Sequence, residues 1–509
     1  MTEENSWYSR IGDVPAAEAD IIVRAFREHG IEIGGASDPA DEDEDVTPNG
    51  VGFMYAEGHI LTREQHLGGV EGIRGPQRIQ TANRQRGVLD ILQDQGVGEV
   101  EVERVVRDVM LVRLNARRPS ASSGGDDGYP GTSGTPGTPG PPEGDRGSAE
   151  GELPSVLDVL DRIDEELGEG IATPDHVLTA ANGLMGPCSA TEPQEVYPTA
   201  GPYPAVCRDG GARVRIFIAD TGLLHDAAKI FPWLDGVRGD PDPRTHLGGT
   251  IHPYGGHGTF VAGVLRSVAP EAQIHVANIF NIAGSALESH FVGRLNEAFG
   301  FGFEILHLTA SCMTRKNTQL MALETWLELL GSYKGVVCVA PAGNNHTRRP
   351  SWPGALPGVI SVGALSTDWR RRADFSDYGG WVDVYAPGQK LINAFGRGTY
   401  TCQIPPNAGQ VETFSGLAQW SGTSFSAPIV TGLIAAQMAR RGESAREAAA
   451  ALLAKARTQA IPGVGPVLLP GCHDGEDEHC GCGRCGCGGG CGGGCGCGGR
   501  HGSHGHGPR

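Results

Sequence analysis

Between residues 213 and 462, short apolar runs alternate with stretches of helical periodicity. The runs have the length of buried strands and are too short for ordinary helices. Two of the stretches between them, 287–299 and 320–330, suit crossover helices. Strands alternating with helices are typical of a parallel sheet covered on both faces. We therefore predict an α/β domain with a doubly wound, mostly parallel sheet and helices on both faces. Its strand-like runs are 214–219, 274–277, 305–308, 336–340 and 359–362.

Low-complexity sequence separates this region from the N-terminal part of the chain. Residues 119–150 are dominated by Gly, Pro, Ser and Thr, which predicts a disordered linker. Residues 51–118 before it predict a small α+β unit, either an accessory domain or a propeptide. Residues 151–212 after it start with an apolar stripe of helical spacing, which predicts a helical lead-in to the larger domain. Within these parts we expect a strand, a helix, further strand material and a second helix, at 59–62, 84–95, 100–114 and 153–167.

The charge of the chain is negative and uneven. The formal net charge is −19 at pH 7, and residues 1–50 are strongly acidic, most densely from Asp38 to Asp45. Acidic, apolar-poor sequence is typical of solvated chain, so we predict a disordered N-terminus over residues 1–50. We expect no binding to nucleic acid, because that function needs clustered Lys and Arg.

Targeting signals and cysteine usage bear on the compartment. No apolar stretch approaches the roughly 20 residues of a membrane span, so we expect none. The first four residues, Met1 to Glu4, lack the features of a secretory signal, which predicts a cytoplasmic protein unless export follows a non-classical route. Cysteines before residue 471 are too sparse for a disulfide scaffold. The sequence gives no prediction of the oligomeric state.

Gly, Cys and His dominate residues 463–509, which predicts a disordered tail. Thiolates and imidazoles at this density can bind zinc or copper. Cys482 and Cys485 have the two-residue gap of a zinc site, but the regular spacer and the second pair of such sites are missing. Three interpretations stay open: a tail without function, a metal site, and a peptide that is modified at its thiols or cleaved.

Three polar motifs stand where strands end or helices begin, and α/β sheets carry ligands and catalytic groups at such positions. Asp220 ends the first strand in an Asp-Thr-Gly run, and His257 lies among glycines ahead of an apolar helix. Ser424 lies in a Gly-Thr-Ser run ahead of the helix predicted at 429–441. Each motif alone has an ordinary explanation: a turn-forming Asp, a structural His and a Ser that caps a helix.

Considered together, the three motifs are more specific. They follow one another in the order Asp, His, Ser, separated by 37 and 167 residues, which is also the order in subtilisin. A fourth match, Pro-Ala-Gly-Asn, places Asn344 at a strand end. Residues 213–461 therefore resemble the subtilisin-like serine proteases. The matching residues are Asp220-Thr221-Gly222, His257-Gly258-Thr259 with Val261-Ala262-Gly263, Pro341-Ala342-Gly343-Asn344, and Gly422-Thr423-Ser424 with Ala427-Pro428.

The resemblance implies a serine endopeptidase that hydrolyses peptide bonds through an acyl-enzyme. Ser424 would be the nucleophile, His257 the general base and acid, and Asp220 the group that holds the His257 tautomer. Asn344 and the backbone N–H of Ser424 would stabilise the oxyanion. The substrate would be a protein or a peptide. Catalysis would need no cofactor, and the family resemblance makes structural calcium an expectation.

Two family features are not matched by sequence. The family usually has Ser-Leu-Gly on an edge that pairs with the substrate backbone, and here Thr309, Ala310 and Ser311 stand in its place. Because this pairing uses main-chain groups, we expect substrate binding to be kept at these residues. The altered residues leave the shape of the primary pocket, and with it the cleavage preference, unpredicted. Many members also carry an inhibitory propeptide, but residues 51–118 hold no matching motif. A propeptide and an independent interaction domain both stay open.

Other functions remain as alternatives. A metal-binding or interaction protein would act through the Cys/His tail and use the peptidase fold as a scaffold. A pseudoprotease would keep the fold without a working site, and the intact set of Asp220, His257, Asn344 and Ser424 argues against it. An aspartic protease would need a second Asp-Thr/Ser-Gly motif or a homodimer, and a β-rich chain.

Overall fold

The computed structural model describes nine stretches of the chain: residues 13–37, 52–68, 86–97, 100–114, 154–180, 192–197, 200–205, 213–245 and 249–470. The predicted linker at 119–150, the acidic run at 38–45, and Cys482 and Cys485 lie outside these residues. The expectations for those segments therefore stay predictions.

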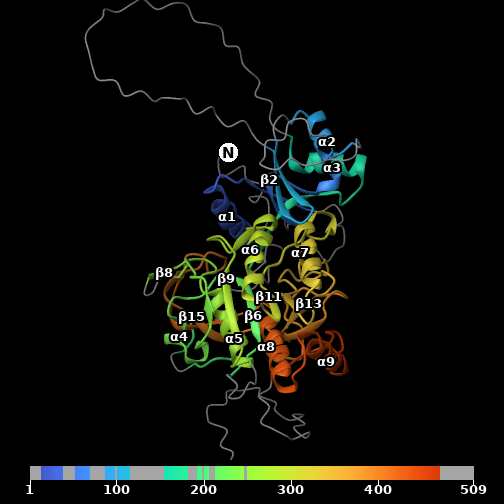
Figure 1. Cartoon of the computed structure of the whole chain (residues 1–509). Coiled ribbons are helices and arrows are strands. Elements are labelled where there is room, and N and C mark those ends of the chain that lie inside the picture. The colour runs from blue at the N-terminus through green and yellow to red at the C-terminus, as the bar shows by residue number, and fades with distance from the viewer. Residues whose placement is uncertain are drawn as a thin grey trace, which may run out of the picture. The chain divides into compact units, whose positions relative to one another are not determined.

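A seven-stranded sheet forms the centre of residues 213–470 (Figure 1). Its strands are β6 (Arg215–Asp220), β7 (Arg238–Gly239), β9 (Gln273–Asn278), β11 (Ile305–Leu308), β12 (Val337–Pro341), β13 (Val359–Leu365) and β14 (Val384–Pro387). They are all parallel, in the order β14-β13-β12-β11-β6-β9-β7. The chain runs outward from β6 in both directions, and such a reversal opens a crevice at the carboxyl ends of the strands. The predicted doubly wound, parallel sheet is confirmed.

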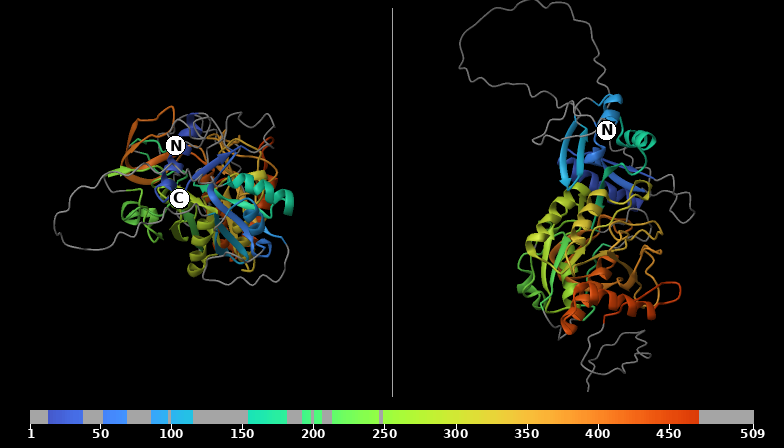
Figure 2. Two further views of the ribbon diagram at one scale, coloured as in Figure 1. Left: turned by 90° about the horizontal axis from the view of Figure 1, so that it is seen from above. Right: turned by 45° about the vertical axis from the view of Figure 1, so that its right-hand side comes forward.

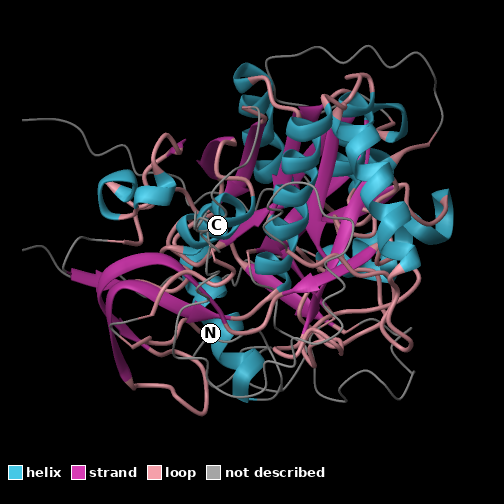
Figure 3. Cartoon of the chain, turned by 90° about the horizontal axis from the view of Figure 1, so that it is seen from below, coloured by secondary structure: helices cyan, strands magenta, loops and turns pink. Residues whose placement is uncertain are grey.

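Helices cover both faces of this sheet (Figure 3). They are α5 (His257–Val268), α6 (Glu288–Phe301), α7 (Met321–Gly331), α8 (Thr423–Arg441) and α9 (Ala445–Thr458). Ile216 and Ile218 of β6 share a core cluster with α5 and α8, whereas Phe217 and Ala219 share another with α6 and α7. Because successive strand residues point to opposite faces, one face packs against α5 and α8, whose cluster also includes α9, and the other packs against α6 and α7. Among the described helices, none is long and apolar enough to cross a membrane.

A second, smaller sheet packs in the same core cluster as α5 and α8. Its strands are β8 (Gly249–Ile251), β15 (Leu391–Thr401) and β16 (Val411–Trp420). β15 and β16 form an antiparallel hairpin that ends at Trp420, just before the Gly-Thr-Ser run. The short elements are helix α4 (Ala227–Ile230), strand β10 (Ser285–Leu287) and 3-10 turns at Glu64–His66, Pro232–Leu234 and Arg315–Asn317.

The N-terminal part forms an antiparallel sheet with two helices on one face (Figure 2). Its elements are β2 (Phe53–Arg63), α2 (Val88–Asp94), β3 (Val100–Val106), β4 (Val109–Leu114), α3 (Val156–Leu167) and β5 (Ala172–Thr179). The strand order is β5-β2-β4-β3. Ile91 of α2 and Leu160 of α3 pack with Ile60 of β2 on one face. On the other face, Leu61 and Leu111 join the cluster of α6 and α7.

The predicted elements of the N-terminal part are present, but they are grouped differently. The sequence assigns the helix at 153–167 to a lead-in for the larger domain. Instead α3 and β5 complete the N-terminal sheet. Apolar residues on both faces of β2 indicate an internal strand, and an internal strand has a partner along each edge. β4 pairs with one edge of β2, and β5 pairs with the other. The Gly- and Pro-rich composition at 119–150 therefore does not mark the end of a folding unit, because α3 and β5, which follow it, belong to the same sheet as β2 and β4.

Helix α1 (Asp13–Arg27) and strand β1 (Ile33–Ala36) contradict the prediction of disorder throughout residues 1–50. β1 pairs with β2. Ile22 and Phe26 of α1 are buried in one cluster with Met54, Leu287 and Met313. The acidic mean composition of residues 1–50 does not reveal the apolar face of α1. Burial depends on which helix face carries the apolar residues and not on mean composition.

Candidate active site

Asp220 and His257 form a buried pair at the carboxyl end of the central sheet. Asp220 is the last residue of β6, and His257 is the first residue of α5. His257 Nδ1 lies 2.9 Å from Oδ1 and 3.0 Å from Oδ2 of Asp220, and both residues are 0% exposed. Burial by itself would raise the pKa of Asp220, but the adjacent His257 and the backbone N–H of Thr221 outweigh burial and lower it. The carboxylate therefore stays ionised beside the imidazole.

The start of α5 is held by Thr221 of the Asp-Thr-Gly motif and by Asp242, which no sequence motif revealed. Gly256 precedes the helix with φ of +80°, and a Cβ there would lie 2.8 Å from the ring of Phe395. The backbone N–H of Gly256 donates to Asp242 Oδ2 at 2.8 Å, and that of Gly258 donates to Thr221 Oγ1 at 3.0 Å. These bonds satisfy N–H groups that a helix start otherwise leaves unpaired, and they fix the His257 backbone.

Asp242 is paired in turn with a buried arginine. Arg244 Nη1 lies 2.9 Å from Asp242 Oδ1, and neither side chain is exposed. Arg244 also donates to the carbonyl oxygen of Thr221 at 3.0 Å. A buried ion pair is tolerable when further hydrogen bonds satisfy its polar atoms, as they do here. No sequence signal marked Asp242 or Arg244, because neither belongs to a matching motif.

Ser424 lies in the first turn of α8, which begins at Thr423 after the N-cap residue Gly422. The ordinary alternative for this motif, a serine that caps the helix, therefore does not apply, because the N-cap residue is Gly422. Its Oγ donates a hydrogen bond to the carbonyl oxygen of Ala180 at 2.9 Å. His257 Nε2 is buried without a hydrogen-bond partner among the described residues. The imidazole ring lies 5.2 Å from the ring of Phe425, which follows Ser424.

Asn344 follows β12 and lies against the same turn as Ser424. Its Oδ1 accepts hydrogen bonds from the backbone N–H and from the Oγ1 of Thr423, both at 2.9 Å. The backbone N–H of Gly343 donates to Thr423 Oγ1 at 3.1 Å. With Oδ1 committed to Thr423, the donor Nδ2 of the amide is directed away from Thr423. Such a fixed amide donor can stabilise a developing negative charge.

The end of β5 lies between strand β10 and the segment at Ser311, which follows β11. β5 pairs antiparallel with β10, and Ala180 donates its N–H to the carbonyl oxygen of Gly284 at 2.9 Å. On the other side, Thr179 donates its N–H to Ser311 at 3.1 Å and accepts the N–H of Ser311 at 2.9 Å. This is the main-chain pairing by which an edge strand binds an extended peptide.

Thr309, Ala310 and Ser311, the three residues expected to bind a peptide, have different environments in the structure. Ser311 makes the main-chain pair with Thr179. Thr309 donates from Oγ1 to the carbonyl oxygen of Ala219 at 2.7 Å, and Ala310 is buried in the core. Among the three, main-chain hydrogen bonds to the peptide-like strand are thus made by Ser311.

His307 is a polar residue of the site that the sequence analysis did not single out. It is fully buried in β11, and its Nδ1 lies 2.9 Å from Thr431 Oγ1. Burial lowers the pKa of His307 to about 3; the charge of Asp220 raises it by a smaller amount, and His257 lowers it slightly further. This imidazole is therefore neutral and adds no charge beside the Asp220–His257 pair. The histidine inside an apolar strand, Ile-Leu-His-Leu, was the available signal.

Metal-binding side chains are not clustered in the described part of the chain. Within it, no group of three or more His, Cys, Asp or Glu side chains is placed to hold a metal ion. The described residues therefore offer no such cluster as a candidate site for the structural calcium expected from the family resemblance.

Comparison with known proteins agrees with this geometry. The profile of the subtilase family matches residues 211–481, which include all four residues of the site. The chain belongs to the subtilase family. This subtilase is 30% identical over 246 residues to the thermophilic serine proteinase of Bacillus sp. (strain AK1), a match that covers 46% of the chain and 54% of that proteinase. It is 28% identical over 258 residues to thermitase of Thermoactinomyces vulgaris, covering 48% of the chain and 80% of thermitase.

The chain thus spans about half the length of the first of these relatives. Among solved structures, fervidolysin from Fervidobacterium pennivorans is 18% identical, with a TM-score of 0.47, and the match covers 86% of this chain and 64% of fervidolysin.

Proposed function

We propose that this subtilase is a serine endopeptidase that uses Asp220, His257 and Ser424 as a catalytic triad. The observation that carries the proposal is the buried Asp220–His257 pair, at 2.9 Å, next to a serine whose hydroxyl is already hydrogen-bonded to a peptide carbonyl. The Asp220–His257 pair supports the roles of orienting carboxylate and base, and the bond of the Ser424 hydroxyl to a peptide carbonyl supports the role of nucleophile. The substrate class is a protein or a peptide.

The reaction follows from the roles of these groups. Ser424 Oγ attacks the carbonyl carbon of the scissile peptide bond, and His257 Nε2 accepts the hydroxyl proton. Asp220 keeps the proton on Nδ1 and stabilises the imidazolium. The tetrahedral oxyanion is stabilised by Asn344 Nδ2 and the backbone N–H of Ser424. His257 then gives the proton to the leaving amine, and water hydrolyses the acyl-enzyme by the reverse sequence of proton transfers.

We further propose that the N-terminal unit, residues 53–180, is an inhibitory propeptide. Its last strand occupies the position of a bound peptide between β10 and Ser311, and its end meets the Ser424 hydroxyl. An independent interaction domain, the other possibility, would not need to insert a strand beside the nucleophile. Self-cleavage shortly after Ala180 would free this end and open the site to other substrates.

Function through the Cys/His tail is not proposed further. Residues 463–470 of the predicted tail are ordered, with Val467 and Leu468 buried, so disorder is not borne out for them. The Cys- and His-rich residues 471–509 lie outside the described residues, and the family match concerns the peptidase region.

Labelling with a fluorophosphonate probe tests the proposed activity. The probe forms a covalent bond with an activated serine, so wild-type protein should be labelled, and mass spectrometry should place the label on Ser424. Ser424→Ala and His257→Ala should both lose labelling. Labelling of Ser421 or Ser426, which lie in the same segment, would overturn the assignment of the nucleophile.

A further inference from the structure

Asp377 is a buried carboxylate that faces the turn carrying Asn344. Its Oδ1 accepts hydrogen bonds from the backbone N–H groups of Asn345, at 2.8 Å, and Thr347, at 3.1 Å. Its Oδ2 accepts from Nδ2 of Asn345 at 3.3 Å. Hydrogen bonds to an ionised carboxylate are stronger than those between neutral groups. Asp377 therefore holds the chain that immediately follows Asn344.

The same residue also holds the chain immediately before Asn344. The backbone N–H of Asp377 donates to the carbonyl oxygen of Gly343 at 3.0 Å. Gly343 has φ of +108°, and a Cβ at this position would lie 2.2 Å from Asp377 Oδ2. Glycine is required here both for the backbone angle and for the close approach of the carboxylate. Asp377 is thus hydrogen-bonded to the residue before Asn344, Gly343, and to the residue after it, Asn345.

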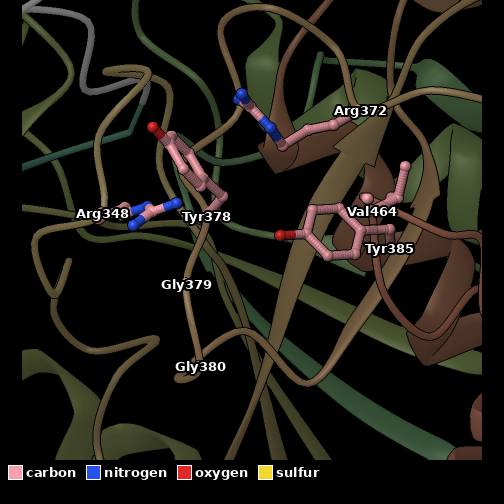
Figure 4. A pocket seen from close by; sticks show the side chains of 8 residues that line it. Arg348, Arg372, Tyr378, Gly379, Gly380, Tyr385 and Val464 are labelled. Carbon is pink, nitrogen blue, oxygen red and sulfur yellow. The ribbon is translucent and has the colours of Figure 1, made fainter. Parts of the chain in front are cut away.

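Two arginines, Arg348 and Arg372, lie against the ring of Tyr378, the residue that follows Asp377 (Figure 4). The Arg372 guanidinium lies 4.1 Å from the centre of the Tyr378 ring, and that of Arg348 lies 5.3 Å from it. Burial raises the pKa of Asp377 to about 7, and the backbone hydrogen bonds of Thr347 and Asn345 and the charge of Arg372 limit this rise. The positive charge thus helps to keep the carboxylate ionised.

Two sets of contacts fix Asn344 for the reaction proposed above. Thr423 sets the orientation of the Asn344 amide, and Asp377 sets the position of its backbone. An oxyanion donor acts only when it is held at the place where the charge develops. We propose that Asp377 is a positioning residue for Asn344, an inference that rests on the proposed peptidase function. Asp377 would act on the rate through the placement of the amide, without touching the substrate.

The first test compares steady-state kinetics of wild type and Asp377→Asn on a peptide substrate, each expressed as the full chain and assayed after cleavage beyond Ala180 is complete. The substitution keeps the shape of the side chain and removes the charge that accepts the N–H groups. We expect kcat to fall about 10- to 100-fold, less than the loss of an oxyanion donor itself, while KM stays within about twofold because an oxyanion donor acts mainly in the transition state. Asp374→Asn, an exposed carboxylate three residues away, is the matched control and should leave both constants unchanged.

The second test repeats Asp377→Asn in an Asn344→Ala background. If Asp377 acts through Asn344, the second substitution adds almost no further loss, because the donor is already gone. An equal fold-loss of kcat in both backgrounds, or a wild-type kcat for Asp377→Asn alone, would overturn the inference. If Asp377→Asn does not fold, Asp377→Glu, which keeps the charge and displaces it, enters the same comparison with the same expectations. Wild-type protein that neither hydrolyses the peptide nor reacts with the probe would instead overturn the proposed function.

Discussion

The hydroxyl of Ser424 donates a hydrogen bond to the carbonyl oxygen of Ala180, 2.9 Å away and 244 positions earlier in the chain. The nucleophile is therefore engaged by the backbone of the same polypeptide. The preceding residue, Thr179, is hydrogen-bonded to Ser311 in both directions. An external peptide could not use these groups until the segment leaves. Under the proposal that the N-terminal unit is an inhibitory propeptide, we interpret this state as that of an inhibited precursor.

Removal of α1 and β1 should loosen the segment in the active site. α1 shares an apolar cluster with Val177 of β5 and Leu287 of β10, so it stabilises the strand that meets Ser424. In the Ser424→Ala protein, deletion of residues 1–37 should make amide hydrogen exchange at Thr179 and Ala180 at least 10-fold faster, because their bonded state is then held by fewer contacts. Unchanged exchange would show that β5 is held without α1.

Docking of α1 should weaken as pH rises. Burial raises the pKa of Glu18 to about 8, with a smaller contribution from the charge of Glu192. A raised pKa in the docked state means that docking favours the protonated form: its contribution is complete below pH 4.5 and is lost as pH rises through 8.

Hydrogen exchange of α1, corrected for intrinsic rates, measures this effect. In the Ser424→Ala protein, protection should fall between pH 6 and pH 9 if the pKa of about 8 governs docking. Glu18→Gln keeps the neutral form and should remove the pH dependence. Glu28→Gln, on the exposed surface, is the control and should behave as the parent protein. A pH dependence that persists in Glu18→Gln would assign it to another group.

Asp220→Asn should reduce peptide hydrolysis by about 10⁴-fold, as loss of the orienting carboxylate does in a serine-protease triad. Asn cannot accept the Nδ1 proton of His257 in the same way, so the imidazole is left in the wrong tautomer. The melting temperature and kcat are the measurements. A variant that melts like wild type but retains more than a tenth of its kcat would contradict the role of Asp220.

Asn344→Ala should lower kcat by about 10²- to 10³-fold with little change in KM, because the lost donor acts mainly in the transition state. Thr423→Val removes the Oγ1 that bonds to Asn344 and keeps the backbone N–H bond. We expect it to lower kcat less than Asn344→Ala does. A rise in KM with unchanged kcat for Asn344→Ala would assign this residue to ground-state binding.

The sequence predicts the parallel domain and the candidate site because both depend on local patterns. Short apolar runs mark the buried strands, and Asp220, His257, Asn344 and Ser424 each stand in a short motif next to such a run. Asp242 and Asp377 carry no motif. Their importance comes from hydrogen bonds to residues 14 to 32 positions away, which only the folded chain brings together.

The N-terminal part was harder to predict for two physical reasons. α3 and β5 follow a Gly- and Pro-rich segment, yet they belong to the sheet that precedes it, since strand pairing depends on edges in space and not on chain order. α1 has an acidic composition, and its docking depends on a few apolar residues such as Ile22 and Phe26. Average composition reveals neither the strand pairing of β5 nor the apolar face of α1.

The central claim is that the first segment bound and cleaved at Ser424 belongs to the N-terminal unit of the same chain. Intact-mass and N-terminal analysis of purified wild type and Ser424→Ala tests it most directly. We predict that wild type is cut after Ala180 and before residue 213, where the larger domain begins, and that Ser424→Ala remains uncut. Cleavage of Ser424→Ala at the same bond would contradict self-processing. A wild-type protein that hydrolyses peptides while this stretch stays uncut would contradict the inhibitory role of the N-terminal unit.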